Sequence, residues 1–263
     1  MKKIINTIFI FFTVYTHAGV AIYSSDTTVL GLEINEKSNL TTSTLLGGGN
    51  DAGGASIADC SVKYKLKEQN KNYEGNLIPF STDLMGYESD SKNIALFEVD
   101  KKIITFTTNE SIDVCPLGTD FTGDYSLVNS KSREYKADFD SLIKLNHTNA
   151  LHLFKTDGAL EASISLEPYI KESISNNLYY EEIFNDYGFL LQQAGLNKDA
   201  INILSLVIKK SPKRAVAYLN IADASWGEAD KKAAAQFYKL YIYLVSENNH
   251  TYKIPQRAID RSL

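Results

Sequence analysis

The most constraining feature of this sequence is a set of small residues that recurs with a fixed period near the C-terminus. Gly188 and Ala200 are followed, 34 residues later in each case, by Ala222 and Ala234. Two helices can cross closely only where a side chain at the crossing is small, so this pattern predicts paired helices that pack tightly. Pro212 separates the two units, because proline cannot continue a helix.

Residues 181–214 resemble the tetratricopeptide repeat, a helix–turn–helix unit of 34 residues. The matching residues are the aromatic Phe184, the small Gly188 and Ala200, the large apolar Leu191 and Leu204, the turn residue Gly195 and the closing Pro212. A second unit over residues 215–248 keeps the register through Tyr218, Ile221, Ala222, Ala234 and Tyr238. It departs from the family pattern at Ser225 and Ser246, where a large residue and a proline are usual.

The resemblance implies an array of helical hairpins that binds another protein, with no partner specified, since one fold serves many functions. The first helix of each pair lines the groove in this family. The corresponding residues here are Glu182, Asn185, Phe189, Gln192, Val216, Leu219, Asp223 and Trp226. None of them is Lys or Arg, so the carboxylate clamp of some family members is not expected, and an apolar or basic partner would suit the groove. Alternatively, Trp226 and Phe189 only fill gaps between helices.

Two units are fewer than the three or so that such an array usually needs for stability. We therefore expect the segment before residue 179, or the preceding domain, to cover the exposed end. Residues 253–261, with Pro255 at a helix start, are expected to form a final capping helix. The helical domain is thus predicted over residues 179–263.

The N-terminus has the pattern of an export signal. Lys2 and Lys3 precede an apolar stretch over residues 4–15, and small residues follow, so residues 1–21 are predicted to be a signal peptide cut after Ala18 or Ala21. The alternative is an uncleaved anchor, but the apolar stretch is shorter than the roughly 20 residues that span a bilayer. We expect a periplasmic or secreted protein that is not stably inserted in a membrane after cleavage.

Residues 22–145 are predicted to form an antiparallel β domain, which makes the chain an α+β protein. Candidate strands lie at residues 28–34, 61–67, 94–99, 103–107 and 124–128, and five to seven strands are expected in one sheet, sandwich or partial barrel. In residues 61–67, Val62, Tyr64 and Leu66 alternate with three lysines, which indicates one buried and one exposed face. The glycine-rich residues 47–54 lack the context of a phosphate-binding loop and are expected to be a surface loop.

Cys60 and Cys115 are the only cysteines, and both lie in the β domain. In an exported protein such a pair indicates a disulfide, although two separate thiols remain the alternative. Residues 146–178 are predicted to connect the two domains. Within them, residues 151–154 and 160–166 fit either strands or packing segments, while a weak helical pattern begins near residue 138.

The remaining observations argue against catalysis and against nucleic acid as a partner. The formal net charge is −5, whereas binding to a nucleic acid requires clustered Lys and Arg side chains. No nucleophile motif is present, and His147 and His152 are spaced so that they share neither a helix face nor a strand face, so no metal or cofactor is expected. The predicted function is an exported protein-binding adaptor or scaffold without catalysis. The alternatives are an immunity or inhibitor protein against an exported toxin, and a hydrolase with its site in the β domain.

Overall fold

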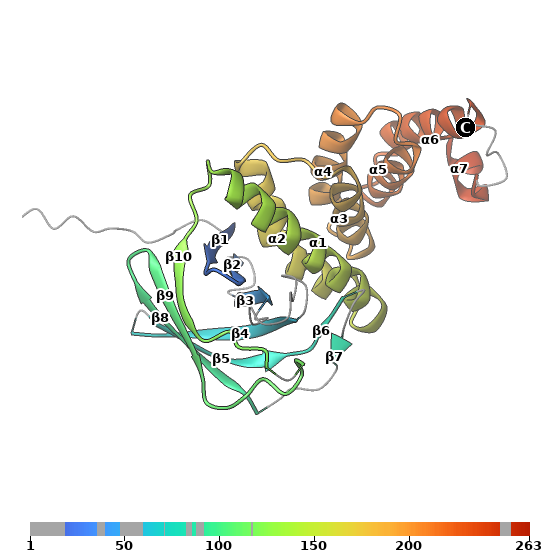
Figure 1. Ribbon diagram of the computed structural model, residues 1–263. Helices are drawn as coiled ribbons and strands as arrows, with labels where there is room; N and C mark the ends of the chain where they lie inside the picture. Colours follow the sequence, from blue (N-terminus) through green and yellow to red (C-terminus); the bar gives the residue numbers. More distant parts are fainter. Residues whose placement is uncertain are drawn as a thin grey trace, which may run out of the picture.

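The computed structural model describes residues 19–35, 40–47, 60–70, 72–82, 86–87, 92–116, 118–247 and 254–263. Among these residues, a β-barrel forms the N-terminal half, and seven helices follow it (Figure 1). The predicted α+β class is therefore confirmed. Most of the predicted glycine-rich loop, residues 48–54, lies outside the described residues.

Eight antiparallel strands close into one barrel, because each strand pairs with the next and the last pairs with the first. The strands are β1 (Gly19–Ser24), β2 (Thr28–Asn35), β3 (Leu40–Gly47), β4 (Ser61–Gln69), β5 (Asn72–Ile78), β8 (Ile94–Asp100), β9 (Ile103–Thr108) and β10 (Gly123–Leu127). A small hairpin, β6 (Phe80–Ser81) with β7 (Gly86–Tyr87), stands apart between β5 and β8. The expectation of five to seven strands in one sheet, sandwich or partial barrel is thus corrected to a closed barrel of eight strands.

The inside of the barrel is packed with side chains. Val62, Tyr64 and Leu66 of β4 point inward as predicted, and Tyr64 meets Phe97 and Phe106 edge to face. The disulfide between Cys60 and Cys115, with Cα atoms 5.7 Å apart, is present as predicted and lies at the edge of this core. It joins the start of β4 to the segment between β9 and β10.

The outward face of β4 differs from its prediction. Lys65 and Lys67 are exposed, but Lys63 is buried because helices cover this part of the barrel. Its Nζ lies 2.7 Å from Oε2 of Glu33 on β2. Two helices that the sequence left undecided provide this cover.

These helices are α1 (Arg133–Thr156) and α2 (Ala159–Ser175). The expected domain boundary at residue 145 therefore falls inside a helix, and the expected connecting segment, 146–178, consists mostly of α1 and α2. At the other end, β1 begins at Gly19, inside the stretch assigned to the signal peptide. Both helices pack on the outer face of β1 and β2, with Val20, Ile22 and Val29 in the shared core.

Four helices follow over the region where paired helices were predicted: α3 (Glu181–Gln193), α4 (Asn197–Lys210), α5 (Ala215–Gly227) and α6 (Lys231–Glu247). Each packs on the next, and α2 packs on α3, so the array continues from the helices on the barrel (Figure 1). A β-carbon at Gly188 would lie 2.6 Å from Cγ of Leu204, which shows why α3 and α4 need glycine at this approach. A short helix, α7 (Gln256–Arg261), packs on α6.

Candidate functional site

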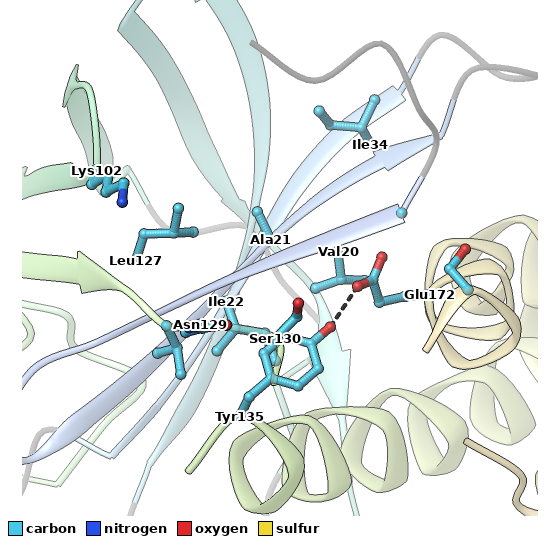
Figure 2. A pocket seen from close by; sticks show the side chains of 13 residues that line it. Val20, Ala21, Ile22, Ile34, Lys102, Leu127, Asn129, Ser130, Tyr135 and Glu172 are labelled. Atoms are coloured by element: carbon cyan, nitrogen blue, oxygen red, sulfur yellow. Dashed lines mark hydrogen bonds between the residues drawn. The ribbon is translucent and has the colours of Figure 1, made fainter. Parts of the chain in front are cut away.

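Two surface cavities adjoin α1, and the larger lies beside the first strand. It has a volume of about 560 Å³ and opens where β1, the end of β10 and the two barrel-covering helices meet (Figure 2). The lining residues that matter below are Gly19, Val20, Lys102, Asn129, Tyr135 and Glu172. We call this cavity the β1 notch.

The notch exists because β1 and β10, the two strands that close the barrel, pair over only a short length. β10 pairs with β1 only at Tyr23 and Ser24, and the N–H of Val128 adds one bond, 2.8 Å, to the carbonyl of Ile22. The chain then leaves towards α1, while β1 continues to Gly19 along β2. Since hydrogen-bonding groups alternate along an antiparallel strand, the N–H and C=O of Val20 face the notch.

One carboxylate dominates the helical side of the notch. Glu172 of α2 accepts hydrogen bonds at Oε1 from the hydroxyl of Tyr135 and from Nδ2 of Asn176, the latter at 2.6 Å (Figure 2 shows the first). Its other oxygen faces the strand, because a β-carbon on Gly19 would lie 2.7 Å from Oε2. No sequence motif points to Glu172, since Tyr135 and Gly19 come from distant parts of the chain.

The second cavity, about 410 Å³, lies where the β6–β7 hairpin, α1 and α3 meet. Its lining consists of Ser81, Thr82, His147, Thr148, Leu151, His152, Lys155 and Glu182. We call it the junction cavity. Both histidines line it despite their spacing of five residues, because the cavity extends along α1 between Ser81 and Thr82 on one side and Glu182 of α3 on the other. His147 and His152 therefore line a single cavity, although their spacing puts them on no common helix or strand face.

His147 is held in place by a partner from the next helix pair. Its Nε2 lies 3.0 Å from Oδ2 of Asp186 on α3, and both side chains are mostly buried. Asn185, next to Asp186, donates to Oδ1 of that carboxylate at 3.2 Å. The helices α1 and α3 are thereby joined by polar contacts beside the cavity.

The groove residues predicted on α3 have different environments. Glu182 is exposed and lines the junction cavity, whereas Asn185 is buried. Phe189 packs edge to face on Phe154 of α1, with ring centroids 5.5 Å apart, and so fills a gap between helices. Gln192 is half-buried near the end of the helix.

On α5 the capping helix covers part of the predicted groove. Val216 is exposed and Leu219 half-buried, but Asp223 pairs with Arg257 of α7 at 2.8 Å. The guanidinium of Arg261 lies 4.6 Å from the ring centroid of Trp226.

Asp223 also ties the middle of α6 into this contact. It accepts a hydrogen bond from the hydroxyl of Tyr238 at 2.5 Å. Burial, and to a lesser degree this bond to Asp223, raises the pKa of Tyr238 to about 12. The acidic and aromatic part of the predicted groove is thus occupied by this chain's own arginines.

Within the described ranges, no three His, Cys, Asp or Glu side chains are grouped so as to hold a metal ion. In the same part of the chain, no helix has both the length and the apolar character to cross a bilayer. Comparison with protein-family models and with curated proteins found no match to this chain.

Proposed function

We propose that this chain is an exported adaptor that binds a polypeptide segment at the junction cavity. The single observation that carries the proposal is the position of this cavity, between the β6–β7 hairpin and the first helices of two successive pairs. Glu182, a residue that the repeat pattern assigned to partner binding, contributes to its lining. Cavities of a few hundred cubic ångströms with convergent polar groups are the usual place of ligand contacts.

Membership of the tetratricopeptide family is part of this proposal, and two features support it. The helices α3–α6 follow the expected boundaries, and α1 with α2 forms a further pair in front of them. This third pair of helices would bring the array to the three repeats that such arrays need for stability. It is invisible in the sequence because Phe154 and Leu166 stand one period before Gly188 and Ala200, where small residues are expected.

Export is supported by the composition of residues 1–18 and by the disulfide. A disulfide persists in an oxidising compartment and is rare in the cytosol. The bound segment would then belong to another exported or envelope protein. The junction cavity offers His147, His152 and Lys155 for polar or acidic groups and Leu151 for an apolar one. The sequence favoured an apolar or basic partner, and the pairing of Asp223 with Arg257 and Arg261 of α7 weakens the support for the basic one.

Site-specific photocrosslinking in the exported protein tests the proposal. A photoreactive amino acid replaces Glu182 at the cavity or, as the matched control, Gln236 on the exposed face of α6. We expect a discrete protein adduct from position 182 only, and a several-fold smaller yield when Lys155→Glu is added. The absence of an adduct at 182, or equal adducts at both positions, would contradict the proposal. If the adduct contained an exported toxin, the immunity alternative would replace the adaptor.

A further inference from the structure

The β1 notch lies beside the two predicted cleavage positions of the signal peptide, which we call the leader. Its first lining residue, Gly19, pairs with Ile34 of β2, and from there β1 pairs with β2 over its whole length. Val20 and Ile22 are buried beneath the helices, at 4% and 1% exposure. The first three residues of β1 are therefore part of the barrel wall.

Of the two cleavage positions, only one is compatible with this wall. A cut after Ala21 would remove Gly19, Val20 and Ala21, and with them three of the six pairs between β1 and β2. It would also take Val20 out of the core shared with α1 and α2. A cut after Ala18 leaves the strand and its core contacts complete.

The surroundings of Gly19 also suit a charged chain end. Oε2 of Glu172 lies against the backbone at Gly19, while Oε1 is already bonded by Tyr135 and Asn176. The amino nitrogen of Gly19 is attached to the same Cα as this β-carbon position, so Oε2 lies close to the part of the chain where a new amino group would form. Among the described residues lining the notch, the titratable side chains are those of Lys102, Tyr135 and Glu172.

We propose that the leader is cut between Ala18 and Gly19, and that the new α-ammonium group pairs with Oε2 of Glu172. The inference rests on the export proposed above. In the reaction a leader peptidase adds one water across the amide: the C–N bond breaks, hydroxyl goes to the carbonyl carbon of Ala18, and hydrogen goes to the nitrogen of Gly19. At neutral pH the proton of the new carboxylic acid is released, and the freed amine is protonated.

The pairing predicts that the stability of the folded protein depends on pH. An α-amino group has an ordinary pKa of about 7.7–8.0, and a neighbouring carboxylate favours its charged form. The folded protein therefore holds this proton more tightly than the unfolded chain. The stabilisation is complete below about pH 7.7 and is lost as the pH rises through the raised pKa of the folded state.

The first measurement is the intact mass of the protein purified from the periplasm of a Gram-negative host. We expect a chain that begins at Gly19. A chain beginning at Ile22 would overturn this inference alone. A chain that stays in the cytoplasm with its leader attached would contradict the proposed export as well.

The second measurement compares two exported variants with the same change of charge on α2. Glu172→Gln removes the carboxylate of the notch, and Glu161→Gln removes an exposed one on the same helix. We expect Glu172→Gln to lower Tm at pH 6.5 by about 2–4 °C more than at pH 9.5. Glu161→Gln should lower it equally at both values. If the effect of Glu172→Gln does not depend on pH, the ammonium is not paired with this carboxylate.

Discussion

At the scale of single residues, the most demanding feature is an ion pair buried between the barrel and the helices. Lys63 and Glu33 are almost fully buried, and Nζ of Lys63 also donates to Oδ1 of Asn146 on α1 at 2.6 Å. The hydroxyls of Thr42 and of Tyr169 on α2 donate to Glu33, at 2.5 and 2.6 Å. A buried charge is tolerated only when it is paired and its remaining hydrogen-bonding capacity is used, as here.

Replacing Lys63 by Met should therefore destabilise the protein strongly. The carboxylate of Glu33 would stay buried without its cation, a change that typically costs about 3–5 kcal/mol of the free energy of unfolding. Urea denaturation followed by circular dichroism measures the loss. Lys65→Met is the matched control, because Lys65 lies on the same face of β4 but is exposed. Equal losses in the two variants would show that the pair is not important for stability.

At the scale of elements, the fit between α3 and α4 depends on the missing side chain of Gly188. Alanine favours a helix by about 1 kcal/mol over glycine, but a β-carbon here would overlap Leu204, and overpacking costs about 1–3 kcal/mol. We expect Gly188→Ala to lower the stability by up to about 2 kcal/mol in thermal denaturation. The second change Leu204→Val should restore part of it. A stabilised Gly188→Ala variant would mean that the two helices are not in close contact.

The docking of α7 is a weaker contact between elements. Asp223 pairs with Arg257 and Arg261, both partly exposed, and exposed pairs contribute about 0.2–1 kcal/mol each. We expect Asp223→Asn to speed hydrogen exchange of the amides in α7 by about two- to fivefold. Glu181→Gln, which breaks the pair with Arg214 on another surface, serves as the control and should leave α7 unchanged.

At the scale of the whole molecule, buried tyrosines in both cores make the free energy of unfolding depend on pH. Burial raises the pKa of Tyr64 and Tyr125 in the barrel, of Tyr169 between barrel and helices, and of Tyr187 in α3. The nearby carboxylate of Glu33 adds to the effect at Tyr169. These phenols stay protonated in the folded state at a pH where the unfolded chain loses its protons.

The sign of the effect on stability follows from these pKa values. Because they are raised above the unfolded value of about 10, the stabilisation is complete below pH 10 and decreases above it. Each such tyrosine should lower the free energy of unfolding by about 1.4 kcal/mol for each further pH unit. Urea denaturation between pH 9 and 11.5 measures this slope. Tyr187→Phe should reduce it by one tyrosine's share, and an unchanged slope would contradict the argument.

The sequence by itself determined the elements that depend on neighbours along the chain. Helical spacing and small residues identified α3–α6, alternation identified the inward face of β4, and strand-forming residues at 94–99 and 103–107 identified β8 and β9. The disulfide followed from the only two cysteines. Apart from the disulfide, each of these signals is contained in one local segment, where the period of the side chains reflects the period of the backbone.

Only the tertiary structure decided the features that depend on segments far apart in the chain. Closing β1 on β10 made a barrel of the predicted sheet, and covering it with α1 and α2 buried Lys63 on a face that alternation alone marked as exposed. The same packing brought Glu172 to Gly19 and both α1 histidines to one cavity. The physical reason is that a side chain's environment depends on which distant surfaces cover it, and local periodicity carries no information about that cover.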